Sequence, residues 1–182
     1  MCIRDRGTRI EQVVLLPILG INTAIISIIA QNYGAKNFDR IKQTYFTAIK
    51  YAFIIMITSG IIVFISAGII PSIFSNDPEV IEYGKRYLKI SAFVLPAYPV
   101  FFLSNGFFMA LKKSENAMIS NFFRNVLNPI VVFYIAKHIG ASFETFFWIW
   151  VCINWFFSIP YFFVIIYYLK VKLNKSSGVV HP

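Results

Sequence analysis

The sequence has few charged residues. Only 14% of its 182 residues are Asp, Glu, Lys or Arg, whereas 58% are hydrophobic and 18% are aromatic. A soluble domain carries about 25% charged residues, because its surface faces water. This shortage of charge excludes a water-exposed globule of this size and indicates that the protein folds in lipid.

Cysteine and histidine are equally scarce. The chain has two of each, and their spacing offers neither a disulfide framework nor a set of metal ligands, so we expect no metal site and no cofactor. The opening stretch, MCIRDRGTRI, lacks the apolar core of a secretory signal. Its first letters resemble a translated sequencing adapter. We therefore expect residues 1–8 to form a non-native or disordered leader, and the origin of residues 1–6 stays open.

Long apolar runs are what the sequence has in abundance. A bilayer core about 30 Å thick needs about 20 apolar residues in a helix. Five runs meet this requirement. We predict an all-α polytopic membrane protein that occupies residues 9–173, with residues 174–182 as a cytoplasmic tail. The five predicted transmembrane helices span residues 10–32, 45–74, 88–111, 117–137 and 144–170.

Two connections between these runs are amphipathic. After Gly34, apolar residues recur from Phe38 to Ile49 at spacings of three and four, with basic residues on another face. This pattern predicts a short helix in the headgroup layer. Before the third run, Asp77 suits a helix N-cap and Pro78 suits the first helical position. A second short interfacial helix is therefore expected there.

The basic residues of the loops predict the orientation. Cytoplasmic loops carry the excess of Lys and Arg. One side receives nine of them, namely Lys36, Arg40, Lys42, Lys50, Lys112, Lys113, Lys170, Lys172 and Lys175. The other side receives five, namely Arg9, Lys85, Arg86, Lys89 and Lys137. We therefore expect the C-terminus to be cytoplasmic and the N-terminus to lie outside, which suggests that an earlier helix is missing. The basic residues behind the net charge of +9 lie mainly in these loops, so no nucleic-acid partner is expected.

Two stretches resemble a known transporter family. The segment RIEQVVLLPILGINTAIISIIAQNYGAKNFDRI is similar to the eighth-helix region of multidrug and toxic compound extrusion (MATE) transporters. The resemblance rests on Pro17, Gly20 and the residues Gln31, Asn32, Gly34 and Ala35. The segment IIPSIFSNDPEVIEYGKRYLKI resembles the family's connection between its ninth and tenth helices.

The resemblance implies a partial lobe of a larger protein. Family members have twelve helices in two six-helix lobes, with both termini cytoplasmic. Residues 9–173 would be the C-terminal lobe without its first helix. The implied partners are the lipid bilayer, the N-terminal lobe, that missing first helix and a small-molecule substrate. The implied location is the inner cell membrane.

The fourth run carries the clearest candidate site. Asn121, Arg124, Asn125 and Asn128 recur at three- and four-residue spacing, which places them on one stripe of a helix. A charge near the bilayer centre costs about 2.5–3.5 kcal/mol on the most lenient scale, so the stripe should face protein or water. It either lines a substrate cavity or forms an inter-helix hydrogen-bond network in which Arg124 reaches towards the headgroups.

The first and third runs supply further candidates. Pro96 and Pro99 remove backbone hydrogen bonds and are expected to bend their helix. Tyr98 and Asn105 on that helix either contact substrate or serve a static kink. The first run has a seam of small residues that we expect to allow close helix packing, with Gln31 at its end and Asn22 on another face as weaker cavity candidates. The seam consists of Gly20, Ala24, Ser27 and Gln31.

Acidic residues are absent from the middle of every run. Some MATE transporters hold their coupling ion with C-lobe carboxylates, one of them on the tenth helix. The matching run here has none, so the Na⁺ or H⁺ site is expected outside this chain.

The resemblance implies a secondary active multidrug efflux antiporter that exports organic cations or amphipathic compounds in exchange for Na⁺ or H⁺. A lipid-linked oligosaccharide flippase of the same superfamily is the alternative, with Arg124 holding a pyrophosphate. A membrane-embedded enzyme is disfavoured, because no run pairs a nucleophile with a base. The substrate, the choice of ion and the ability of this fragment to fold or transport alone stay open.

Overall fold

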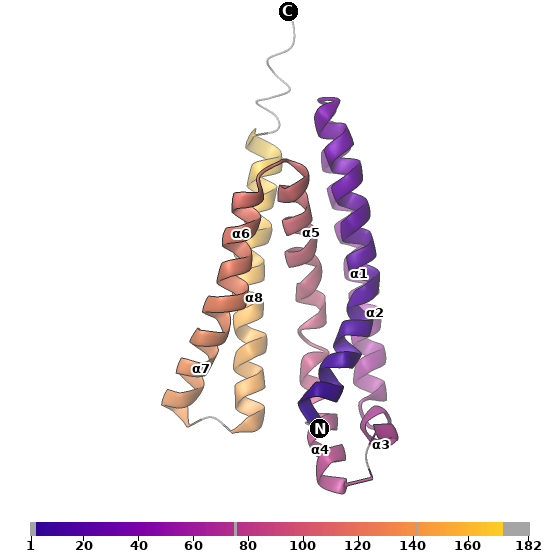
Figure 1. The fold of residues 1–182 in the computed structure, drawn as a ribbon, viewed down its shortest axis with the longest axis vertical. Helices are drawn as coiled ribbons and strands as arrows, with labels where there is room; N and C mark the ends of the chain where they lie inside the picture. Colours follow the sequence, from indigo (N-terminus) through magenta and orange to yellow (C-terminus); the bar gives the residue numbers. More distant parts are fainter. Residues whose placement is uncertain (1–2, 75, 141, 173–182) are drawn as a thin grey trace, which may run out of the picture.

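Helices make up every regular element of the described residues. The computed structural model describes residues 3–74, 76–140 and 142–172, and within them there is no strand. Figure 1 shows long helices lying side by side. They are α1 (Ile3–Gly34), α2 (Phe38–Ser66), α3 (Ile70–Phe74), α4 (Pro78–Ser91), the 3₁₀ turn η1 (Leu95–Ala97), α5 (Tyr98–Ala110), α6 (Ser114–Phe122), the π-helical segment η2 (Phe123–Leu127), α7 (Asn128–Ile139), α8 (Phe143–Tyr167) and the π-helical segment η3 (Tyr168–Lys172). The predicted all-α membrane fold is confirmed.

Four segments of the described chain are long and apolar enough to cross a bilayer. They are Gln12–Gly34, Phe38–Ser66, Pro78–Ala110 and Glu144–Val171. The remaining predicted crossing, residues 117–137, is helical but assembled from α6, η2 and α7, each too short to span alone. Its role as a fifth crossing stays a prediction.

The predicted interfacial helix after Gly34 is the first part of α2. That helix begins at Phe38, with Asn37 as its cap, and not at residue 45. Phe38 and Ile41 are buried in the bundle. The prediction of a separate short helix was wrong because the apolar face does not stop at Ile49. It continues through Ala52, so one helix buries the whole face.

The end of the second predicted helix was also wrong. The α2 helix ends at Ser66, and the short α3 follows at Ile70–Phe74. Pro71 explains this break, because its ring lacks an N–H and would clash with the carbonyl of a preceding helical turn.

The third crossing is interrupted and does not run as one helix over 88–111. The predicted cap at Asp77 is present, since its carboxylate accepts a hydrogen bond from the Glu79 amide at 3.0 Å. The resulting α4 ends at Ser91, and the chain resumes as η1 and α5. Pro96 lies in η1 and Pro99 in the first turn of α5, where missing N–H groups leave carbonyls without helical partners.

Side chains of α8 bond carbonyls at this interruption. The Trp155 indole Nε1 donates to the Phe93 carbonyl at 3.1 Å, and the Ser158 hydroxyl lies 3.5 Å from the Ala97 carbonyl. In lipid, backbone groups released by a helix break must find partners within the protein. The contacts therefore join α8 to the interrupted crossing.

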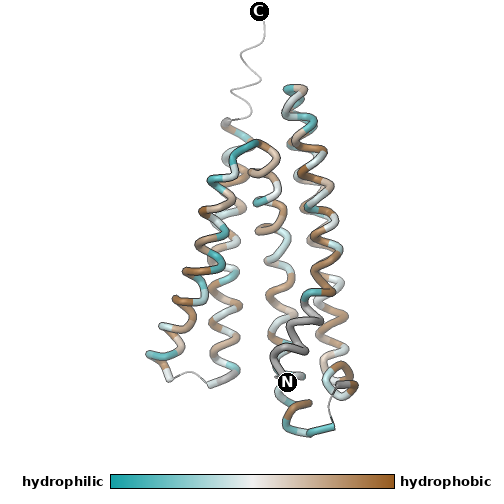
Figure 2. The backbone as a smooth tube through the Cα atoms, in the orientation of Figure 1, coloured by the Kyte–Doolittle hydropathy of each residue, from teal (hydrophilic) through white to brown (hydrophobic). Residues whose placement is uncertain are grey.

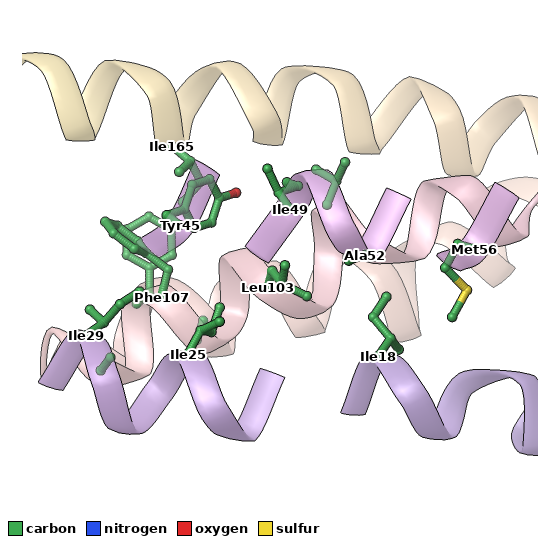
Figure 3. Packing of buried hydrophobic residues seen from close by; sticks show 14 of the residues in the cluster. Ile18, Ile25, Ile29, Tyr45, Ile49, Ala52, Met56, Leu103, Phe107 and Ile165 are labelled. Carbon is green, nitrogen blue, oxygen red and sulfur yellow. The ribbon is translucent and has the colours of Figure 1, made fainter. Parts of the chain in front are cut away.

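The main core lies mostly between α1, α2 and α5, and side chains of α8 pack against it. Figure 3 shows Ile25 of α1, Tyr45 of α2, Phe107 of α5 and Ile165 of α8 converging there. Inside this core the Tyr45 hydroxyl lies 3.0 Å from Ser104 Oγ, so both polar groups are satisfied.

The small-residue seam of α1 has no packing partner among the described residues, so its role in helix packing stays a prediction. Gly20, Ala24, Ser27 and Gln31 are all exposed, and a Cβ added at Gly20 would meet no atom within 4 Å. The buried face of α1 is instead formed by its isoleucines, because their larger side chains bury more apolar area.

The predicted leader and tail lie partly outside the described residues. The α1 helix begins at Ile3 and so includes residues 3–8 of the leader. Residues 1–2 and the tail at 174–182 are outside the described ranges.

Basic segments gather at one end of the bundle. Figure 1 places the α1–α2 turn, the α5–α6 turn and the end of α8 at the same end, with α3 and the α7–α8 turn at the other. Figure 2 shows apolar residues along the middle of α1 and α2 and polar residues in these turns. The three turns at the first end hold Lys36, Lys112, Lys113 and Lys170.

Candidate functional site

A cavity lies between η1, α5, the α6–η2–α7 helix and α8. Its volume is about 600 Å³. Pockets for small molecules range from about 300 to 1,000 Å³, so this one can hold a single compound of that class. The lining residues are Ala97, Tyr98, Phe101, Phe108, Asn116, Ile119, Ser120, Phe123, Arg124, Asn128, Asn154, Phe157, Ser158, Pro160, Tyr161, Val164 and Tyr168.

Arg124 is the cationic group of this lining. Its guanidinium carbon lies 4.1 Å from the ring centre of Phe101, 4.8 Å from that of Tyr98 and 5.4 Å from that of Phe102. These distances are within the range of cation–π attraction. These three rings all lie near the start of α5 and hold the guanidinium inside the bundle.

The backbone at Arg124 is π-helical. The segment Phe123–Leu127 inserts one extra residue per turn between α6 and α7. Such segments are often found at functional sites, because they change the direction of side chains relative to a regular helix. The predicted stripe is therefore split: Arg124 and Asn128 line the cavity, whereas Asn125 is exposed.

Asn128 is the most buried polar residue of the lining. Its side chain is 1% exposed, and its Oδ1 atom has no hydrogen-bond partner among the described residues. A buried oxygen without a partner is destabilising unless a donor reaches it. The oxygen is closed to a water-sized molecule, so a donor in the cavity reaches it once the Asn128 side chain turns towards the cavity.

A hydrogen-bonded chain of side chains joins three helices beside the cavity. The Tyr161 hydroxyl of α8 donates to Asn105 Oδ1 of α5 at 3.1 Å. The Asn105 amide then lies 3.4 Å from Asn121 Oδ1 of α6. Asn105 and Asn121 are therefore engaged with each other, and Tyr161 connects them to the cavity wall.

The structure brings some of the predicted site residues together and separates others. Tyr98, Arg124 and Asn128 line the cavity. Asn22 lies on α1, where its Oδ1 atom would be 2.1 Å from a Cβ added at Gly106 of α5. Gln31 is exposed near the end of α1. Neither Asn22 nor Gln31 belongs to the lining.

The α8 side of the cavity was missed in the sequence. Asn154, Ser158 and Tyr161 are spaced four and three residues apart in an otherwise apolar helix. That spacing places them on one face and would have been a usable signal. Asn154 is held by a bond from its Nδ2 atom to the Trp150 carbonyl at 2.9 Å.

Carboxylates lie away from the cavity in the described part of the chain. No described Asp or Glu is among the lining residues. Within the residues searched, no group of His, Cys, Asp and Glu side chains could hold a metal ion. The ion pairs of the described residues join Arg86 with Glu82 and Glu144, and Lys42 with Asp39.

A protein-family model described as MatE matches residues 6–135, which is more than half of the sequence. This chain belongs to the MATE family. Its solved structural neighbours agree with the assignment. A crystal structure of a MATE in complex with MaL6 matches 97% of this chain with a TM-score of 0.85 at 19% identity.

Two curated relatives show the same family resemblance at the sequence level. The "FAD transporter" of Shewanella oneidensis is 27% identical over 84 residues, which is 46% of this chain and 19% of that protein. The "Probable multidrug resistance protein YpnP" of Bacillus subtilis is 32% identical over 126 residues, which is 69% of this chain and 27% of that protein. The matching regions span about a fifth to a quarter of these relatives and 39% of the solved MATE.

Proposed function

We propose that this chain is part of the C-terminal lobe of a secondary active efflux antiporter, and that exported compounds occupy the cavity beside α5 and α8. The observation that carries the proposal is that cavity. It is lined mostly by aromatic and apolar side chains with a few polar groups, which is the usual composition of a small-molecule site.

The energy source in this proposal is a Na⁺ or H⁺ gradient across the inner cell membrane. The coupling ion binds in a part of the transporter beyond this chain, since the described cavity offers it no carboxylate. The N-terminal lobe and the first helix of the C-terminal lobe complete the transport path. Two lobes that rock around a central site would expose it to each side in turn.

A lipid-linked oligosaccharide flippase is the second candidate, and Arg124 is the observation that favours it. A pyrophosphate carries several negative charges and is bound best by several cationic donors. Among the described lining residues, Arg124 is the only Lys or Arg. The antiporter is therefore the better supported of the two.

The test begins with the upstream coding sequence and a transport assay on the full-length protein. Everted membrane vesicles are given a Na⁺ or H⁺ gradient, and accumulation of both cationic and anionic dyes is measured. Gradient-dependent accumulation is expected. Ser120→Trp, which places an indole in the cavity, should lower the rate by about tenfold.

The matched control is Thr58→Trp, which adds the same indole on the exposed side of α2. It should keep the wild-type rate to within about twofold. Absence of gradient-driven transport of every dye, or equal loss in both variants, would contradict the proposed function.

A further inference from the structure

We propose that this cavity binds an anionic group of an aromatic amphipathic compound, with Arg124 as its charged contact and Asn128 accepting a hydrogen bond from the same compound. The inference rests on the proposed function, because it takes the cavity to be the substrate site. It narrows that function, since organic cations are then excluded from the cavity.

The charge of Arg124 has no carboxylate to balance it in the described structure. The carboxylates of the described ion pairs contact Lys42 and Arg86, and none lines the cavity. A guanidinium stays protonated in proteins, so Arg124 cannot lose its charge to suit an apolar site. Charges buried in a protein are normally paired. Within the described residues the position of that partner is open, and an anionic ligand in the cavity can take it.

Arg124 also occupies the rings that a cationic compound would need. Phe101, Tyr98 and Phe102 all lie within 5.4 Å of its guanidinium carbon. A second cation would lose these faces and would be repelled by the guanidinium. The arrangement therefore disfavours positively charged compounds, which an aromatic cavity without Arg124 would attract.

The planar geometry of the guanidinium leaves donors for a ligand. Its five N–H groups lie in one plane and form a rigid fork. One of them is engaged with the Tyr98 hydroxyl. Two parallel N–H groups suit the paired oxygens of a carboxylate, sulfonate or phosphate.

Arg124 lies far from either end of its helix. It follows Ser114, the first residue of α6, by ten positions, which is about 15 Å at the helical rise. That depth is about half of a bilayer core. The structure points its guanidinium at α5 within the bundle, so the charge is held at the depth of the cavity and not among headgroups.

Asn128 provides an independent observation. It follows Arg124 by one helical turn, lines the same cavity and keeps a buried Oδ1 atom without a partner in the described structure. Once the Asn128 side chain turns towards the cavity, a hydroxyl or N–H group beside the anionic group of the ligand would satisfy this oxygen. The ligand class is thus an aromatic body with a sulfonate, carboxylate or phosphate and a hydrogen-bond donor.

The experiment compares two probes of the same shape and opposite charge. The full-length protein that contains this chain is placed in phosphatidylcholine nanodiscs, and binding is followed by probe fluorescence. The probes are 6-hydroxynaphthalene-2-sulfonate and (6-hydroxynaphthalen-2-yl)trimethylammonium. The sulfonate should bind at least about tenfold more tightly, as one charge-assisted hydrogen-bond pair allows.

Three variants assign the difference to Arg124. Arg124→Gln should weaken sulfonate binding by about tenfold or more and leave the cation unchanged or tighter. Arg124→Lys keeps the charge without the planar fork and should fall between the two. Arg86→Gln, at an exposed cation that pairs with Glu82 and Glu144, should change neither probe. Equal or tighter cation binding by the wild type, or equal loss of both probes in Arg124→Gln, would overturn the inference.

A variant at Asn128 tests the donor without altering the charge. The hydroxylated sulfonate should bind about fivefold more tightly than naphthalene-2-sulfonate, and Asn128→Leu should remove that preference. A preference that persists in Asn128→Leu would refute this assignment. Adding phosphatidylglycerol to the nanodiscs identifies the natural source of the anion: competition with the sulfonate assigns the site to a lipid headgroup, and its absence assigns it to a free compound.

The two proposals fail in different ways. If the sulfonate binds through Arg124 but no dye crosses a membrane, the antiporter proposal fails and the anion site stands. If cationic dyes are transported and Arg124→Gln has no effect on them or on the sulfonate, the antiporter stands and the anion site fails.

Discussion

At the scale of single residues, two buried asparagine oxygens share one chemical feature but differ in their surroundings. Asn22 and Asn128 both have an Oδ1 atom without a partner in the described structure. Asn22 faces the backbone of Gly106, where α1 and α5 approach closely. Asn128 belongs to the lining of a cavity that can hold a ligand. The same chemical feature therefore predicts a stability effect at one position and a binding effect at the other.

We expect Gly106→Ala to destabilise the bundle by about 1–3 kcal/mol, the usual cost of an overpacked site. The added Cβ would lie 2.1 Å from Asn22 Oδ1 and 3.1 Å from Ile26 Cγ1. The free energy of unfolding in mixed micelles measures the effect. Combining Asn22→Ala with Gly106→Ala should restore most of the loss, because the oxygen responsible for the clash is gone.

Gly20→Ala is the matched control for this prediction. A Cβ at that position meets no atom within 4 Å, and alanine favours a helix by about 1 kcal/mol over glycine. The variant should therefore be neutral or slightly stabilising. Equal destabilisation at Gly20 and Gly106 would mean that close approach of α1 and α5 is not the cause.

Residue types alone predicted part of the site. The sequence indicated Arg124 and Asn128 because a charge and an amide repeat on one helical face in an apolar run. It did not separate them from Asn125, because the π-helical turn changes the direction of that side chain. The rings that hold Arg124 come from α5, and the sequence gives no measure of distances between helices.

At the scale of elements, the interrupted third crossing and α8 depend on each other. The 3₁₀ turn η1 directs the Ala97 amide to the Val94 carbonyl and so leaves the Phe93 carbonyl without a helical partner. The α8 helix places Trp155 at the Phe93 carbonyl and Ser158 at the Ala97 carbonyl. The sequence predicted a bend from the prolines, since their loss of an N–H is a local property. It did not reveal the partners, which lie about 60 residues away along the chain.

We expect Trp155→Phe to destabilise the bundle by about 1 kcal/mol, because the Phe93 carbonyl loses its indole donor in an apolar environment. In a Pro96→Ala background the same change should cost less, since a regular helix would let the Ala97 amide reach that carbonyl. Unfolding free energies of the four proteins in this cycle measure the coupling.

Trp148→Phe is the control for the tryptophan variant. Its ring packs against Phe93 at a centre distance of 5.6 Å, and phenylalanine retains an aromatic contact there. Its cost should be smaller than that of Trp155→Phe and independent of residue 96. Identical costs in both backgrounds for Trp155→Phe would show that the carbonyl does not depend on the indole.

The sequence predicted which helices exist better than it predicted where they begin and end. Apolar length identified the crossings, because a bilayer requires it. The start of α2 at Phe38 was missed, since an amphipathic turn can lie either in headgroups or against a neighbouring helix. Only the presence of α1 and α5 beside it, which bury Tyr45, decides between these outcomes.

At the scale of the whole molecule, charge asymmetry and the fold give a consistent orientation. The turns around Lys36, Lys112 and the end of α8 meet at one end of the bundle, and α4 begins, with Glu79 in its first turn, at the other (Figure 1). The fold is therefore consistent with the orientation predicted from the Lys and Arg count, because all of the lysine-rich turns would face the same compartment. Under the proposed topology that compartment is the cytoplasm.

Cysteine labelling tests this topology in the full-length protein after its cysteines, Cys152 among them, have been replaced by serine. Lys112 and Lys85 are both exposed, at opposite ends of the described bundle. A membrane-impermeant maleimide should label Lys85→Cys in intact cells and Lys112→Cys only after permeabilisation, because positive loops stay in the cytoplasm. Equal labelling of both variants in detergent controls for reactivity. The reverse pattern in intact cells would contradict the proposed topology and place the lysine-rich turns outside the cell.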